Sequence, residues 1–166
     1  YNPEKAKKLL AEAGYPNGFE TPFLAYRNRD YAEAMINNLN AVGITAKFEY
    51  LKYAAFRDKV QSGGAPFNFG TWGSYSINDV SAITSHFQSG GKDDYSKDPE
   101  VIKQLAIGDT SVDANVRKAA YKAALSRISG EAFMFPLWSY NTWYAFSKDV
   151  DFNPTPDEIP RFFTAK

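Results

Sequence analysis

Residues 44–51 read Ile-Thr-Ala-Lys-Phe-Glu-Tyr-Leu, in which apolar and polar side chains alternate. A period of two is typical of a β-strand with one buried face, and this is the clearest strand pattern in the chain. Apolar residues recur at helical spacing over residues 29–42, and a shorter helix is predicted over 53–62. Because Gly43 ends the first helix, the strand lies between two predicted helices.

Helix and strand alternate over the whole first half of the chain. Asn2 and Pro3 begin a helix that ends at Gly14, a strand is predicted over 19–26, and a further strand begins at Phe67. Helices of ten to fourteen residues between strands indicate right-handed crossovers. The predicted fold class is α/β, with a mixed, largely parallel open sheet flanked by helices.

The second half of the chain is predicted to be more helical. Cap residues and prolines indicate helices over 79–87, from Asp98 onward and from Asp113 onward. The aromatic run 133–146 is predicted to form two short strands hinged near its proline. We expect one ligand-binding lobe over 1–150 and an extended, proline-rich tail over 151–166. The predicted buried face of the last helix consists of Tyr121, Ala124, Leu125, Ile128 and Ala132.

The composition excludes several kinds of partner and site. The chain has 166 residues, which suits one compact globular unit. Nineteen basic and nineteen acidic residues give a net charge of zero, so we expect no nucleic-acid partner. The absence of cysteine removes disulfides, thiol nucleophiles and thiolate metal sites, and leaves the compartment open. Aromatic content is 16%, which fits a protein that encloses a small molecule.

The predicted binding site lies where strands end. Residues 67–79 read Phe-Asn-Phe-Gly-Thr-Trp-Gly-Ser-Tyr-Ser-Ile-Asn-Asp, a strand pattern followed by turn residues. Open α/β sheets bind ligands outside the carboxyl ends of their strands. The alternative is a buried strand followed by an ordinary surface loop. The candidate ligand-binding residues here are Trp72, Gly73, Ser74, Tyr75, Asn78 and Asp79.

Further candidates follow the first strand and lie in the aromatic run. Tyr26 and Arg27 end the first strand, and the Arg27 guanidinium can offer two parallel donors to a carboxylate. The alternative for Arg27 is a solvated arginine. Trp138 and Tyr140 are secondary candidates from the aromatic run.

No pattern in the sequence indicates catalysis, a cofactor or a metal. His86 is the single histidine, and its apolar neighbours on a predicted helix favour a packing or surface role. Asp93, Asp94 and Asp98 lack the regular ligand spacing of a calcium loop. Phosphate-binding glycine motifs and the nucleophile motif of hydrolases are absent.

At its start the chain reads Tyr-Asn-Pro-Glu-Lys-Ala-Lys-Lys-Leu-Leu-Ala-Glu-Ala-Gly-Tyr-Pro-Asn-Gly-Phe over residues 1–19. This long motif resembles the family 5 extracellular solute-binding proteins, the dipeptide- and oligopeptide-binding components of ABC importers. Weaker similarities continue in the right order over nearly the whole chain. They comprise Ala32-Glu33, Val42-Gly43-Ile44, Gly70-Thr71-Trp72, Tyr95, Asp98-Pro99, Arg117, Tyr121 and Pro136-Leu137.

The resemblance implies one lobe of a two-lobed, Venus-flytrap receptor with the type II periplasmic-binding-protein fold. It implies a carboxyl-terminal lobe, whose tail returns towards an amino-terminal lobe that is missing here. In relatives that bind peptides, an aspartate three residues after the strand-end tryptophan takes the ligand's amino group, whereas this chain has Tyr75. Asn78 or Asp79 would replace it only if the loop is rearranged. An arginine after the first strand can hold a carboxylate in such relatives, and Arg27 matches it.

The resemblance also implies a role, partners and a place in the cell. We expect a monomeric, non-enzymatic receptor that captures peptides or related polar solutes and delivers them to a membrane permease. It would lie in the periplasm, or outside the cell on a membrane anchor in a Gram-positive host. The isolated piece is expected to bind solute weakly, because half of the contacts are missing. The alternatives are an α/β hydrolase or transferase that uses His86 or an Asp/Ser pair, and a lobe whose aromatic surface contacts only another protein.

Overall fold

The computed structural model describes residues 1–73, 77–153, 155 and 163. Contacts between Cα atoms group the chain into two compact units, Tyr1–Thr71 and Trp72–Lys166. Each unit is described by itself below.

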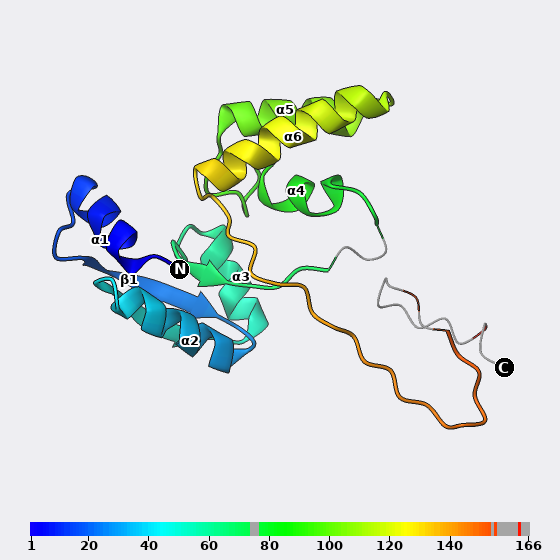
Figure 1. Ribbon diagram of the computed structural model, residues 1–166, viewed down its shortest axis with the longest axis horizontal. Helices are drawn as coiled ribbons and strands as arrows, with labels where there is room; N and C mark the ends of the chain where they lie inside the picture. The colour runs from blue at the N-terminus through cyan, green and yellow to red at the C-terminus, as the bar shows by residue number, and fades with distance from the viewer. Residues whose placement is uncertain (74–76, 154, 156–162, 164–166) are drawn as a thin grey trace. The chain divides into compact units, whose positions relative to one another are not determined.

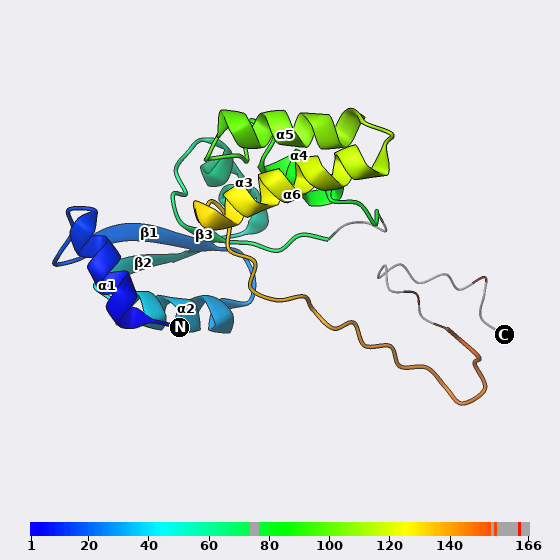
Figure 2. The same ribbon diagram turned by 45° about the horizontal axis from the view of Figure 1, so that its top comes forward.

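The first unit contains a parallel sheet of three strands. These are β1 (Phe19–Ala25), β2 (Ile44–Tyr50) and β3 (Asn68–Phe69), in the order β2-β1-β3. β1 pairs with β2 along its whole length, and its last two residues pair with β3. The β1 and β2 ribbons lie side by side in Figure 2. The predicted α/β class with a largely parallel sheet is confirmed, although β3 is shorter than the strand pattern predicted.

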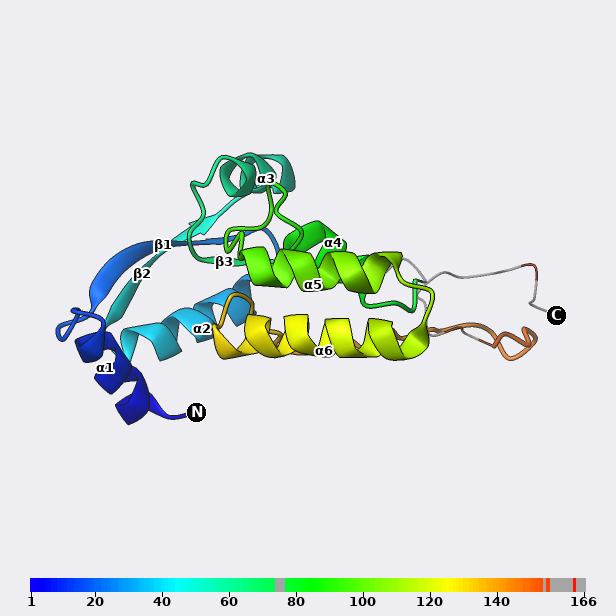
Figure 3. The ribbon, with the colours of Figure 1, turned by 90° about the horizontal axis from the view of Figure 1, so that it is seen from above.

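Three helices accompany this sheet: α1 (Pro3–Glu12), α2 (Arg29–Asn40) and α3 (Tyr53–Gln61). One core cluster joins Phe23 and Ala25 of β1 to Ala32 of α2, and a second joins Leu24 to α3. Because adjacent strand residues face opposite sides, α2 and α3 cover opposite faces of the sheet (Figure 3). This is the arrangement that right-handed crossovers produce.

Two glycines allow the turns before β1 and β2 to pack backbone against backbone. Gly18 has φ +75° and Gly43 has φ +98°, in the left-handed region that favours glycine. A Cβ atom on Gly18 would lie 1.8 Å from the Gly43 carbonyl oxygen. No side chain therefore fits at Gly18 without moving the backbone.

The described residues of the second unit form three helices. Its helices are α4 (Ser81–Phe87), α5 (Pro99–Thr110) and α6 (Ala114–Gly130). α5 and α6 form a hairpin joined by a short link and lie side by side in Figures 1 and 2. The predicted caps are confirmed, because Asp98 and Asp113 each accept two backbone N–H groups at a helix start.

The structure corrects two predictions about the second unit. The described residues 133–146 contain no strand, and Figure 1 shows them as extended chain after α6. Extended backbone becomes a strand only beside a partner, and the one sheet among the described residues consists of β1, β2 and β3. Leu125 is 43% exposed and Ala132 lies beyond the end of α6, so neither belongs to the predicted buried face. None of the helices in the described residues is long and apolar enough to span a membrane.

Candidate functional site

In the first unit, Tyr26 and Arg27 meet Thr71 beyond the carboxyl ends of β1 and β3. The Tyr26 hydroxyl lies 3.0 Å from Thr71 Oγ1, and Arg27 Nη1 donates to the same oxygen at 3.1 Å. The Arg27 guanidinium also lies 5.9 Å from the centre of the Tyr26 ring, a cation–π distance. Two of the predicted ligand-binding residues are therefore brought together by a hydroxyl that follows β3.

The cluster rests on a packed aromatic base. The Tyr26 ring lies 4.8 Å from the Phe56 ring and 5.0 Å from the Tyr53 ring, both on α3. Gly70 adjoins this base, since a Cβ there would lie 3.9 Å from both Phe56 and Tyr26. Packing on α3 holds the Tyr26 ring, and the Tyr26–Thr71 contact fixes its hydroxyl.

Arg27 donates to a hydroxyl, whereas several other arginines of the described chain pair with carboxylates. Arg29 pairs with Glu33, Arg117 with Asp79, and Arg127 with Asp98. Arg27 is exposed, and no described carboxylate lies within ion-pair distance of it. One of its terminal nitrogens is occupied by Thr71, and the guanidinium keeps further donors that can bind an acceptor.

In the second unit, Trp72 packs against α4. Its indole stacks on the His86 imidazole, with ring centroids 4.1 Å apart and planes 19° apart. Phe87 meets it edge-on at 5.2 Å, and indole Nε1 donates to the Ala82 carbonyl at 3.1 Å. Trp72 keeps 38% of its surface exposed. It can therefore offer an aromatic surface to a solute, while its N–H group is engaged within the unit.

Asp79 is engaged by groups of its own unit. Its carboxylate accepts from the Ser81 N–H at 3.0 Å and forms an ion pair with Arg117. The Tyr121 hydroxyl lies 3.3 Å from Asp79 Oδ1, but lies closer, at 2.8 Å, to Asp109. The Ser81 hydrogen bonds and the Arg117 charge hold the pKa of Asp79 below its usual range. Asp79 therefore connects the start of α4 to the α5–α6 hairpin.

Burial also raises the pKa of a tyrosine in this network. Desolvation, reinforced by the hydrogen bond to Asp109, raises the pKa of Tyr121 to about 12. The phenol consequently stays protonated near neutral pH and can serve as a donor to a carboxylate.

The remaining predicted residues are exposed or lie outside the described part. Gly73 and Asn78 are exposed, and Ser74 and Tyr75 belong to residues 74–76, which the structure does not describe. Trp138 and Tyr140 are 46% and 45% exposed and meet edge-on at 6.2 Å in the extended segment after α6. Tyr26 and Arg27 belong to the first unit and the other candidates to the second, so each group is placed within its own unit.

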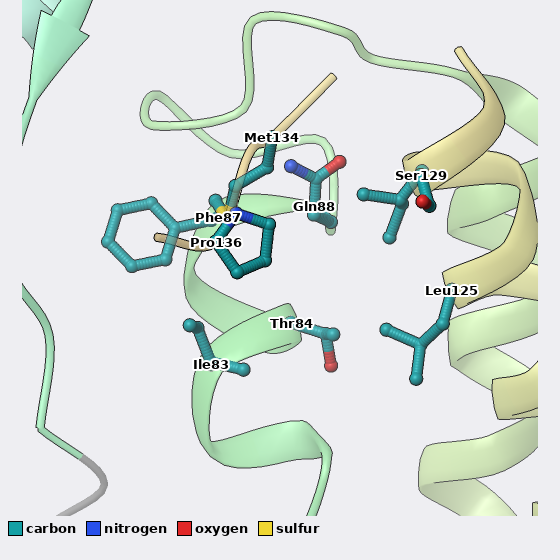
Figure 4. A pocket seen from close by; sticks show the side chains of 9 residues that line it. Ile83, Thr84, Phe87, Gln88, Leu125, Ser129, Met134 and Pro136 are labelled. Carbon is teal, nitrogen blue, oxygen red and sulfur yellow. The ribbon is translucent and has the colours of Figure 1, made fainter. Parts of the chain in front are cut away.

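An apolar pocket of about 260 Å³ lies between α4, α6 and the chain after α6. Figure 4 shows Ile83 and Thr84 of α4 on one side and Leu125 of α6 on the other, with Met134 and Pro136 above Ile83 in this view. Neither Asp79 nor His86 lines this pocket. Among the described residues, no group of His, Asp or Glu is arranged to hold a metal ion.

Comparison with known proteins gives the chain a family. Residues 1–94 of the 166 match the bacterial extracellular solute-binding proteins, family 5, middle region. The chain belongs to this family. The resemblance in the sequence is thereby confirmed. The fold class is confirmed as well, because solved periplasmic binding proteins share this arrangement of helices and strands.

Relatives of known name agree over short stretches. Heme-binding protein A of Haemophilus influenzae is 87% identical over 23 residues, which are 14% of this chain and 4% of that protein. Glutathione-binding protein GsiB of Escherichia coli K12 is 43% identical over 51 residues, which are 28% of this chain and 10% of that protein. Both relatives are named as binding proteins.

Solved structures agree over most of the chain. The ABC transporter-associated periplasmic binding protein DppA of Helicobacter pylori, in complex with peptide STSA, has a TM-score of 0.71 at 26% identity, covering 80% of this chain and 28% of that chain. The dipeptide-binding protein of Pseudoalteromonas sp. SM9913, with Met-Leu, has a TM-score of 0.79 at 24% identity, covering 100% and 36%. At that identity the second similarity shows the fold alone. The chain thus spans about a third of the length of these solved relatives.

Sequence reasoning missed two residues that organise the candidate site. Thr71 was assigned only to the strand, although its position just beyond β3 places a hydroxyl where ligands bind in open sheets. For His86 the sequence favoured a packing or surface role without indicating its partner, and its stacking with Trp72 joins residues fourteen positions apart. No local pattern reports a contact of that kind.

Proposed function

We propose that this chain is part of the solute-binding receptor of an ABC importer. The receptor captures a peptide or related polar solute outside the inner membrane, in the periplasm or on a membrane anchor outside the cell, and delivers it to a permease. Closure of two lobes around the solute supplies the mechanism, since a solute that touches both walls stabilises the closed state. The family of the chain and the names of its relatives support this proposal.

The observation that carries the proposal is the cluster of Tyr26, Arg27 and Thr71. It lies beyond the carboxyl ends of parallel strands, and its exposed guanidinium has no described carboxylate partner. Arg27 is proposed to bind a carboxylate of the solute, with Tyr26 and Thr71 fixing the guanidinium in place. The residues Trp72, Gly73, Ser74, Tyr75, Asn78, Asp79, Trp138 and Tyr140 are proposed as further solute contacts.

The proposed solute lacks a free ammonium group, because this chain has Tyr75 where peptide-binding relatives have the aspartate that binds the amino group. Burying an ammonium without a charged partner is costly, and a phenol is a neutral partner. Asp79 is the nearest alternative in the sequence, but it is held by Arg117 and Ser81 and would have to leave both. We therefore expect peptides with altered or capped amino ends, sugars or modified amino acids, in preference to ordinary dipeptides.

A screen on the full-length receptor tests this assignment. Thermal shift with Met-Leu, N-acetyl-Met-Leu and reduced glutathione is expected to show stabilisation by solutes without a conventional free amino end. Asp79→Asn and Tyr75→Phe are measured beside the wild type. Tight binding of Met-Leu that Asp79→Asn abolishes and Tyr75→Phe leaves unchanged would show an ordinary dipeptide receptor with a displaced carboxylate.

The receptor is proposed to be non-enzymatic. A hydrolase built on His86 would need a serine or threonine hydroxyl beside this histidine in a pocket. In the second unit His86 stacks on Trp72 and faces Asp93, whereas Asp79 pairs with Arg117. An assay in which the full-length receptor recovers each screened solute unaltered after long incubation, by mass spectrometry, checks this part of the proposal.

A further inference from the structure

His86 makes contacts that an ordinary surface histidine does not need. Its ring stacks on the indole of Trp72 and meets Phe87 edge-on at 4.6 Å. Its Nε2 atom is buried without a hydrogen bond among the described residues, and it faces Asp93 Oδ2 at 3.4 Å. The Asp93 side chain is only 8% exposed. The imidazole is therefore held between an aromatic ring and a nearly buried carboxylate.

The same contacts fix Trp72. The stacked imidazole covers part of the indole, Phe87 meets it edge-on, and the Ala82 carbonyl accepts its N–H. A tryptophan held at three points has a single orientation, so it loses little conformational entropy when a solute binds. Because its N–H is already bonded, the exposed part of Trp72 can stack on a solute but cannot direct a hydrogen bond to it.

We propose that His86 is a positioning residue for solute binding, which holds Trp72 as an aromatic platform for a planar or apolar group of the solute. Such groups include an amide plane, a ring and an aliphatic side chain. This inference rests on the proposed function, because it requires Trp72 to belong to the solute-binding wall. His86 itself acts through Trp72 and does not touch the solute.

The first part of the test needs no solute. Near-ultraviolet circular dichroism of the full-length receptor reports the fixed environment of Trp72, as the spectrum of the wild type minus that of Trp72→Phe. The same difference is taken in each His86 variant, with and without Trp72→Phe. The intensity of this band is expected to fall strongly in His86→Ala and to persist in His86→Phe, which keeps an aromatic ring for stacking. Ser85→Ala on the same helix is the control and should leave the band unchanged. A wild-type band in His86→Ala would overturn the positioning of Trp72 by His86.

The second part measures binding by calorimetry, with whichever of Met-Leu, N-acetyl-Met-Leu and reduced glutathione the screen shows to bind most tightly. Loss of one aromatic contact corresponds to a rise in Kd of about 3- to 10-fold, expected for Trp72→Ala and for His86→Ala. His86→Phe should stay within about twofold of the wild type. In a Trp72→Ala background, His86→Ala should cause no further loss, because both substitutions remove the same contact.

The two parts separate the failure of this inference from that of the proposed function. An unchanged Kd in Trp72→Ala would remove Trp72 from the solute-binding wall and overturn the inference. The proposed function would still stand or fall with the Kd of Arg27→Ala. A further rise in Kd when His86→Ala is added to Trp72→Ala would show that His86 acts independently of Trp72, which also overturns it.

Discussion

Asp98 shows how a single carboxylate can join two helices of the fold. It accepts the N–H groups of Glu100 and Val101 at the start of α5 and two hydrogen bonds from Arg127 of α6, at 2.9 and 2.7 Å. The Arg127 hydrogen bond, with the cap contacts, lowers the pKa of Asp98 to about 2. The sequence predicted the cap and favoured it over a calcium site, but it did not indicate the arginine.

The pKa of Asp98 predicts a pH dependence of stability. Its folded-state pKa of about 2 lies below the ordinary value of 3.8, so the ionised form stabilises the fold above about pH 4, and this contribution is lost as the pH falls from 4 to 2. Asp98→Asn keeps a capping side chain and removes the charge. We expect a lower melting temperature for the variant at pH 7, by calorimetry, and a difference that narrows below pH 4.

Glu4→Gln is the matched control for this prediction, because the ion pair of Glu4 with Lys7 joins two exposed side chains and should contribute little to stability. It should show no comparable difference at any pH. A gap between wild type and Asp98→Asn that stays constant from pH 7 to pH 2 would contradict the role assigned to the charge.

Gly18 allows a second test at the level of one residue. Gly14 and Gly18 both have positive φ, at +89° and +75°, but a Cβ on Gly14 meets nothing within 4 Å, whereas one on Gly18 meets the Gly43 backbone. Gly14→Ala should cost about 1–2 kcal/mol from backbone strain alone. Gly18→Ala should lower the melting temperature clearly further, and equal melting temperatures for the two variants would contradict the close approach of these turns.

At the scale of elements, the sequence predicted what local patterns encode. Asn2, Asp98 and Asp113 cap helices as expected, and α1, α2, α3, α5 and α6 begin within a residue or two of their predicted starts. The prediction of strands over 133–146 was wrong, because aromatic composition favours extended backbone but does not provide a partner strand. Contacts such as Arg117 with Asp79, 38 residues apart, leave no local signal.

The α5–α6 hairpin depends on one glycine at the contact between the helices. A Cβ on Gly108 would lie 2.6 to 2.9 Å from atoms of the buried Tyr121 ring. Gly108→Ala is therefore expected to destabilise the protein by about 1–3 kcal/mol through overpacking, despite the better helix propensity of alanine. Thermal unfolding measures the effect.

Gly130 of α6 provides the control for the hairpin, since a Cβ there meets nothing within 4 Å. Gly130→Ala should change stability by no more than about 0.5 kcal/mol. If Gly108→Ala were as stable as Gly130→Ala, the helices would not be as closely packed as the structure has them.

At the scale of the whole molecule, the sequence predicted the family and the fold, whereas its ligand-binding residues remain predictions and include only part of the candidate site. Tyr26 and Arg27 were predicted from their position after a strand, which an open sheet makes meaningful. Thr71 and His86 were not, since their roles depend on which distant side chains they contact. The chain spans about a third of its solved relatives, so a complete solute cleft is a property proposed for the full-length receptor.

The account depends most on Arg27 as the anchor for a solute carboxylate. Calorimetry of the full-length receptor with the tightest-binding screened solute, all of which carry a carboxylate, tests it directly. Arg27→Ala is expected to raise Kd by at least about tenfold, the effect of losing a charge-assisted hydrogen bond. Arg29→Ala, which removes a neighbouring arginine that pairs with Glu33, should leave Kd within about twofold. A wild-type Kd in Arg27→Ala would contradict the proposed site.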